Sequence, residues 1–182
     1  MMRLGISVEG ATDYQIYASP VGLRGRVSLE RIGKELRALL KQFDRVTTFY
    51  DYYGFHKRPP GKVETLEAAI LELVEPESQQ RLIPYVQQYE FEALVLAAPD
   101  AAEKTLGVAG LKQTLEQLTK QYGGAEQVND GYDTCPSRRI KAQVPAYDKK
   151  LHGPVILQDS LAEVREQCPR FNQWVSQLAQ LS

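Results

Sequence analysis

The sequence predicts an α/β fold with a mainly parallel sheet flanked by helices. β-Prone segments alternate with helical patterns in the first half of the chain, which is typical of parallel strands joined by crossover helices. The 182 residues are 43% hydrophobic and 25% charged, enough to bury a sizeable core. No repeat or Gly/Ser-rich linker divides them. We expect one domain over 1–182, with an α/β core at 1–100 and a helical, basic-loop extension at 101–182.

Three strands are predicted in the core. Residues 4–8 are β-prone and lead into Glu9 and Gly10. Residues 45–53 (RVTTFYDYY) are dense in β-branched and aromatic side chains and stop at Gly54. The third strand is expected at 82–87.

Helices are expected between and after these strands. Residues 12–15 (TDYQ) have the pattern of a helix start. Apolar residues fall on one face over 28–43 and over 63–75, where Pro76 should end the second helix. A further helix should begin near Glu90.

The extension has a different pattern. Residues 111–122 predict a helix, and 123–153 look like a loop that is rich in Gly, Pro and charged residues. A short edge strand is expected at 155–157. A capping box at Ser160 should open a helix that Pro169 interrupts, and 171–181 should form a packing helix.

Acidic residues follow each predicted strand of the core. Glu9 follows the first strand, Asp51 lies near the end of the second, and Glu90 and Glu92 follow the third. The carboxyl ends of parallel strands share one edge of a sheet, where ligands bind. Converging carboxylates repel unless a cation lies between them, and oxygen ligands suit Mg²⁺ or Mn²⁺. The spacing therefore predicts a metal site that would act on a phosphate.

Basic residues gather in two predicted loops. The segment 134–152 carries Arg138, Arg139, Lys141, Lys149 and Lys150, and the loop after the second strand carries Lys57, Arg58 and Lys62. Cationic loops beside a metal site would suit a phosphodiester substrate. The alternative for either loop is a solvated surface. The alternative for the acids is helix capping, as at Asp13, or a role for only one of Glu90 and Glu92.

Several functional classes are excluded. The net charge of −1 gives no overall attraction for nucleic acid, so any basic surface must be local. The two cysteines suggest neither a disulfide framework nor a zinc site. No GxxxxGK[ST], GxGxxG or GxSxG motif occurs, so the sequence does not support an ATPase, a Rossmann oxidoreductase or an α/β-hydrolase. Apolar stretches fall short of a membrane span and the N-terminus does not resemble a signal peptide, so we expect no membrane partner and a cytoplasmic location.

Several motifs in fixed order carry a family resemblance. They are VEGATD at 8–13, TFYDYYGF at 48–55, PYVQQYEFEAL at 84–94, PSRRI at 136–140, YDK at 147–149 and CPRF at 168–171. As an ordered set they resemble a bacterial family of unknown function that is classed as Toprim-like. The Toprim fold, a Rossmann-like α/β fold, is shared by primases, topoisomerases and the overcoming-lysogenisation-defect nucleases.

The resemblance implies roles for particular residues. Glu9 would be the general acid/base, and Asp51 would be the first acid of the DxD motif that holds Mg²⁺. The chain departs from the pattern at Tyr53, where the second acid of DxD is expected. Glu90, with Glu92 as a spare ligand, would have to supply the missing carboxylate. Family members also resemble partners of AAA/ABC-type ATPases in phage defence.

These observations lead to one principal interpretation and two rivals. The principal one is a Mg²⁺-dependent nuclease in which Glu9, Arg138 and Lys149 are catalytic and Asp51, Glu90 and Glu92 hold metal. Residues Lys57, Arg58, Arg138, Arg139, Lys141 and Lys150 would then bind nucleic acid. The first rival is a catalytically degenerate module that docks an ATPase or nucleic acid. The second is a small interaction protein whose acids are surface residues and caps.

Overall fold

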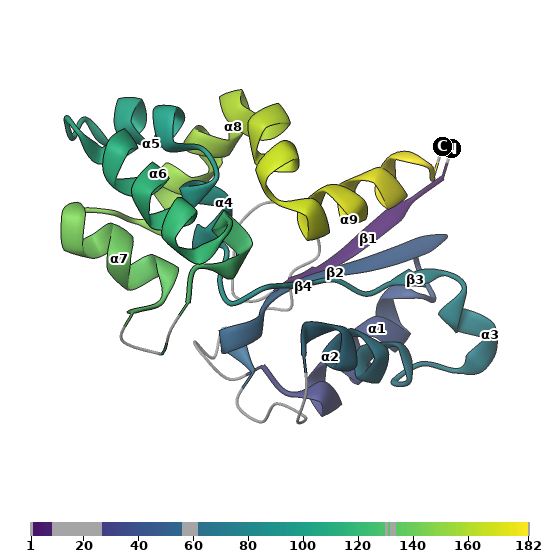
Figure 1. The fold of residues 1–182 in the computed structure, drawn as a ribbon. Helices are drawn as coiled ribbons and strands as arrows, with labels where there is room; N and C mark the ends of the chain where they lie inside the picture. Colours follow the sequence, from purple (N-terminus) through teal and green to yellow (C-terminus); the bar gives the residue numbers. More distant parts are fainter. Residues whose placement is uncertain (1, 9–26, 56–61, 130, 132–133, 182) are drawn as a thin grey trace. The chain divides into compact units, whose positions relative to one another are not determined.

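The computed structural model describes residues 2–8, 27–55, 62–129, 131 and 134–181 (Figure 1). Contacts divide the chain into two compact units, Met1–Gln87 with Leu181–Ser182, and Gln88–Gln180. The sequence placed the end of the α/β core near residue 100. The division comes earlier because the helix after Glu90 packs on later helices of the second unit.

The sheet of the first unit contains only parallel pairings among the described residues. Its strands are β1 (Leu4–Val8), β2 (Arg45–Asp51), β3 (Leu82–Ile83) and β4 (Val86–Gln87). β2 lies at the centre, with β1 on one side and with β3 and β4 on the other. Helices flank this sheet, so the predicted α/β class with a mainly parallel sheet is confirmed.

The third predicted strand is split into β3 and β4. Pro84 has no N–H to donate to a neighbouring strand, and the chain leaves the ladder there. The Thr48 side chain bonds the backbone of the break: its Oγ1 accepts from the Tyr85 N–H at 2.8 Å and lies 2.8 Å from the Tyr85 carbonyl oxygen. The Thr47 Oγ1 donates to the Ile83 carbonyl at 2.7 Å, so two threonine hydroxyls bond the backbone on either side of Pro84.

The described helices of the first unit are α1 (Leu29–Leu39), α2 (Val63–Leu71) and α3 (Pro76–Gln79), with a 3₁₀ turn, η1, at Tyr52–Gly54. Ser28 begins α1 as predicted, because its Oγ accepts the Arg31 N–H at 3.3 Å. The predicted end of the second helix at Pro76 was wrong, because α2 already ends at Leu71. Pro76 opens α3, since proline is well suited to the first position of a helix.

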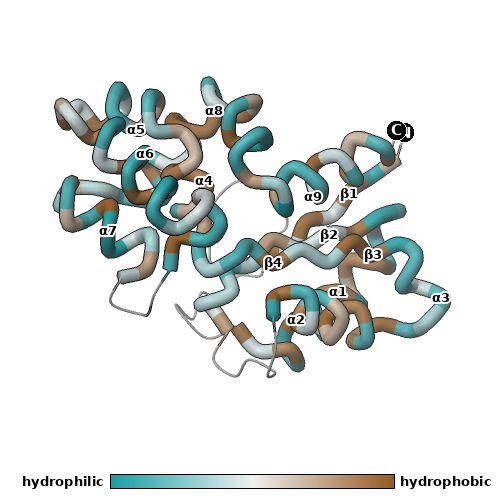
Figure 2. The backbone as a smooth tube through the Cα atoms, in the orientation of Figure 1, coloured by the Kyte–Doolittle hydropathy of each residue, from teal (hydrophilic) through white to brown (hydrophobic). Residues whose placement is uncertain are grey.

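The core of this unit lies between the helices and the sheet. Apolar and polar residues alternate along α1 and α2 (Figure 2). The apolar faces bury Ile32, Leu36, Leu66 and Ile70 against Val46 of β2. Burial of these faces is what holds α1 and α2 in place.

The second unit is helical in its described part. It consists of α4 (Glu92–Leu96), α5 (Pro99–Leu106), α6 (Leu111–Tyr122), α7 (Pro136–Gln143), α8 (Lys149–Gln167) and α9 (Pro169–Ala179), with a 3₁₀ turn, η2, at Ala125–Gln127. Every residue of α4 is buried, and α5, α6, α7 and α8 pack around it. The helix at 111–122 is confirmed to the residue. Among the described helices none is long and apolar enough to cross a membrane.

Three predictions for this unit were wrong. The expected loop at 123–153 contains α7 and the start of α8, and the expected strand at 155–157 lies inside α8. Ser160 does not cap a helix, because it lies within α8 and its Oγ donates to the Ile156 carbonyl at 2.6 Å. The N-cap of α8 is Asp148, whose Oδ1 accepts from the Lys150 and Leu151 N–H groups. The break at Pro169 is confirmed, and the segment 12–15 lies outside the described residues.

Candidate functional site

Asp51 ends the central strand of the first unit, at the carboxyl edge of the parallel sheet. It is half-buried and takes the N-cap position of η1 in an extended conformation. Its partner in the register is Gln87 of β4, whose buried Oε1 accepts from the Tyr85 hydroxyl at 2.7 Å. The predicted acid/base Glu9 lies outside the described residues. In the sequence it follows Val8, the last residue of β1.

Another described acid, Glu35, contacts strand β1 of the sheet. Glu35 of α1 is half-buried and hydrogen-bonds Ser7 of β1, which in turn shares a hydrogen bond with the Tyr50 hydroxyl of β2. Burial raises the pKa of the Glu35 carboxyl, against the opposing effects of the Ser7 hydrogen bond and the Arg31 charge. The sequence did not predict this series of hydrogen bonds, although the polar residues Ser7 and Tyr50 at core-facing strand positions were a signal for it.

Glu90 lies at the beginning of the second unit, where its carboxylate caps a helix. Its Oε2 accepts the Ser137 N–H at 2.9 Å, in the first turn of α7. A carboxylate at this position satisfies a free N–H and interacts favourably with the helix dipole. The preceding residue, Tyr89, has a φ of +63°, a left-handed conformation that is costly for a side chain larger than glycine.

Glu92 and Lys149 form a partly buried ion pair in this unit. Lys149 Nζ lies 3.9 Å from Glu92 Oε2 and 5.2 Å from the centre of the Phe91 ring. The Glu92 side chain is 6% exposed, whereas that of Lys149 is 43% exposed. A β-carbon added at Gly153 would lie 2.6 Å from Phe91 Cε1, so glycine is needed there for α8 to approach the ring.

The predicted nucleic-acid-binding residues have different environments. Arg138, Lys141 and Lys150 are exposed. Arg139 is held inside the unit: its Nε donates to the Thr134 carbonyl at 2.5 Å, its Nη2 donates to the Tyr122 hydroxyl at 2.6 Å, and its guanidinium lies 5.0 Å from the centre of that ring. Lys57 and Arg58 lie outside the described residues.

The structure therefore brings together some of the predicted residues. In the second unit Glu92 meets Lys149, and Glu90 contacts the backbone next to Arg138. Within the described parts of the chain, no group of three or more His, Cys, Asp and Glu side chains could hold a metal ion. Glu90 and Glu92 already have an N–H group and a lysine as partners, and their role as metal ligands stays a prediction.

Comparison with known proteins gives one match. No curated protein and no solved structure matches this chain. A family model described as a domain of unknown function, DUF4276, matches residues 8–179. Because that range covers nearly the whole chain, the protein belongs to the DUF4276 family.

Proposed function

We propose that this protein is a metal-dependent nuclease that cleaves phosphodiester bonds at the carboxyl edge of its parallel sheet. The observation that supports this proposal is the place of Asp51. It ends the central strand, at the edge where ligands bind in open α/β sheets. The sequence adds Glu9 directly after the neighbouring strand β1.

The donor set at this edge fits an ion that is coordinated only in part by protein. Asp51 is half-buried at the end of its strand, and Glu9 is the second acid by sequence position. Mg²⁺ is usually held by one or two carboxylates together with water and substrate phosphates, so a full protein cage is not required. Bound there, Mg²⁺ or Mn²⁺ would activate a water molecule and stabilise charge on the phosphoryl oxygens.

The other roles belong to side chains of this chain. Glu9 would move a proton as general acid/base, in keeping with the resemblance. Arg138 and Lys149 would stabilise charge that develops on the phosphate, and the exposed Lys141 and Lys150 would bind neighbouring phosphates. A partner AAA/ABC-type ATPase that controls the nuclease in phage defence is part of the same proposal.

A second candidate is a docking module without catalysis. It is favoured by Tyr53, which stands at the second position of DxD, and by the contacts of Glu90 and Glu92 with Ser137 and Lys149. Such a module would bind nucleic acid or an ATPase through Arg138 and its neighbours. Charge reversal at Arg138 would abolish its binding, whereas Glu9→Gln would leave it unchanged.

Calorimetric titration of Mg²⁺ and Mn²⁺ separates the two candidates. A saturable site in the wild type that is lost in Asp51→Asn would support the nuclease, and cleavage of plasmid, single-stranded DNA or RNA should fall at least a hundredfold in Asp51→Asn and in Glu9→Gln. Asp159→Asn is the matched control, because Asp159 is exposed on α8. Absence of metal binding and of cleavage, with and without nucleic acid, would reject the nuclease.

A further inference from the structure

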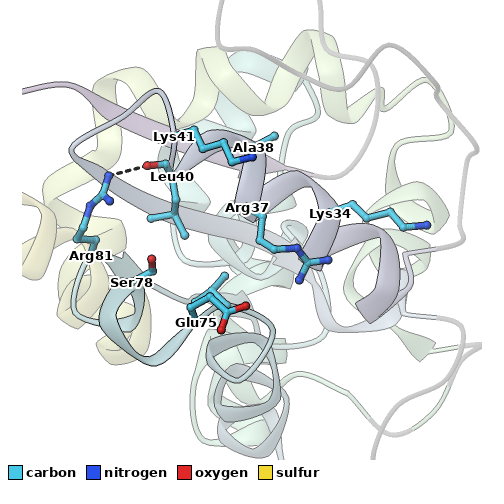
Figure 3. Close-up of a pocket in the computed structure, with 9 residues that line it drawn as sticks. Lys34, Arg37, Ala38, Leu40, Lys41, Glu75, Ser78 and Arg81 are labelled. Atoms are coloured by element: carbon cyan, nitrogen blue, oxygen red, sulfur yellow. Dashed lines mark hydrogen bonds between the residues drawn. The ribbon is translucent and has the colours of Figure 1, made fainter.

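A basic hollow of about 520 Å³ opens between α1 and the segment 74–81 in the first unit (Figure 3). Its volume lies in the usual range for small-molecule sites, roughly 300–1,000 Å³. The lining combines an apolar floor with charged and hydroxyl groups. The basic hollow is distinct from the edge that holds Asp51. Arg81 precedes β3 and Lys41 precedes β2, so it lies at the amino ends of these strands, about 20 Å from Asp51 along a seven-residue strand.

Hydrogen bonds hold the two walls of the basic hollow together. Arg37 of α1 donates from Nη1 to the Leu73 carbonyl at 2.6 Å. Arg81, on the opposite wall, donates from Nη2 to the Leu40 carbonyl at 2.7 Å and from Nε to the Asp44 carbonyl at 3.0 Å. Both walls are therefore fixed before any ligand enters, which lowers the entropic cost of binding.

The floor of the basic hollow is apolar. Ala38, Leu40 and Val74 contribute to it, and Leu40 and Val74 are only 7% and 5% exposed. A flat, weakly polar ring system could cover this floor and displace water from it.

The charge around the basic hollow is mostly positive. Lys34, Arg37, Lys41 and Arg81 contribute four cations, against the single carboxylate of Glu75. Lys41 is exposed and has no hydrogen bond or ion pair among the described residues, whereas Lys34 pairs with Glu30. Lys41 is thus available to an anion, as are the Arg37 N–H groups other than the one that donates to Leu73, and Glu75 and Ser78 can accept hydrogen bonds from a ligand.

We propose that the basic hollow binds a nucleoside monophosphate whose base carries an amino group. The phosphate would lie at Lys41 and the guanidinium of Arg37, the base would cover the apolar floor, and its amino group would donate to Glu75. Each part of such a ligand complements one feature of the lining. The phosphate dianion matches the cations, the flat base matches the apolar floor, and the amino group is a donor for the carboxylate of Glu75.

Calorimetry with three probes tests the proposal in buffer without divalent metal. AMP is expected to bind with one site per chain, and adenosine and ribose 5-phosphate are expected to bind at least tenfold more weakly. Lys41→Glu should weaken AMP at least tenfold. Glu75→Gln should weaken the binding of AMP but leave the binding of ribose 5-phosphate unchanged, since only the base reaches Glu75.

Lys120→Glu is the matched control, because Lys120 is exposed on α6 in the other unit and the variant makes the same change in net charge. Circular dichroism would confirm that every variant is folded. The proposal is overturned if AMP does not bind the wild type, if it binds Lys41→Glu and the wild type equally, or if Lys120→Glu weakens it as much. These outcomes involve neither metal nor cleavage, so they are independent of the proposed nuclease.

Discussion

Replacing Glu126 by alanine should strongly destabilise the second unit. Glu126 lies on η2, is 3% exposed, and accepts the backbone N–H groups of Arg170 and Phe171, each at 3.1 Å. These two groups belong to the first turn of α9, whose N-cap residue, Cys168, makes no side-chain cap. The carboxylate of Glu126, 44 residues before Arg170 in the sequence, therefore caps the N-terminus of α9.

The size of this destabilisation follows from the two backbone N–H groups that the alanine variant leaves without an acceptor. A hydrogen bond to a charged group contributes about 1.5–3 kcal/mol, and a buried donor without a partner costs a similar amount. Burial raises the pKa of the Glu126 carboxyl, so removing the side chain also relieves some desolvation. The net loss in free energy of unfolding should be about 2–4 kcal/mol, with Glu126→Gln intermediate because it keeps one acceptor oxygen.

Urea unfolding followed by fluorescence measures this loss directly. Trp174, the single tryptophan of the chain, lies on α9 with its ring centre 5.7 Å from that of Phe171, so it reports on the helix that Glu126 caps. The midpoint should fall by about 1–2 M. Glu166→Ala, at an exposed position of α8, is the control. A free energy of unfolding for Glu126→Ala within about 0.5 kcal/mol of the wild type would refute the capping argument.

Three further predictions follow from the structure. Gly153→Ala should lower the melting temperature, because the added carbon would lie 2.6 Å from the Phe91 ring. Such overpacking costs about 1–3 kcal/mol, whereas the higher helix propensity of alanine stabilises by about 1 kcal/mol. An unchanged or higher melting temperature would contradict this contact. Burial raises the pKa of Glu35, so the folded state holds that proton more tightly and stability should fall as pH rises from the ordinary carboxyl pKa through the raised one. Glu35→Gln should reduce this fall in denaturation measured across pH, and an identical pH profile would count against it. Arg81→Met should lower the free energy of unfolding by about 2–3 kcal/mol, since Arg81 donates to the carbonyls of Leu40, Phe43 and Asp44. Equal urea midpoints for variant and wild type would show that these hydrogen bonds contribute little.

Much of the first unit was predictable because its signals are local. The β-branched and aromatic residues of β2 and the apolar face of α1 depend only on neighbours in the sequence. The break between β3 and β4 was not predicted, although Pro84 was visible. It is stabilised by Thr48, 37 residues away, and no local pattern shows such a partner.

The second unit shows where local signals fail. The Gly, Pro and charged residues of 123–153 suggested a loop, yet Gly153 lies within α8. Glycine is required at position 153 because the Phe91 ring occupies the space of a side chain, and this contact exists only once α4 and α8 have packed.

The fold class and the place of Asp51 at the end of a strand were predictable from local patterns in the sequence. The partners of the acids, in contrast, depend on how the helices pack. Glu90 caps α7, Glu92 meets Lys149, and Glu126 caps α9. The environment of a carboxylate is set by the N–H donors and cations that packing brings to it. Those groups lie tens of residues away, where no spacing rule reaches them.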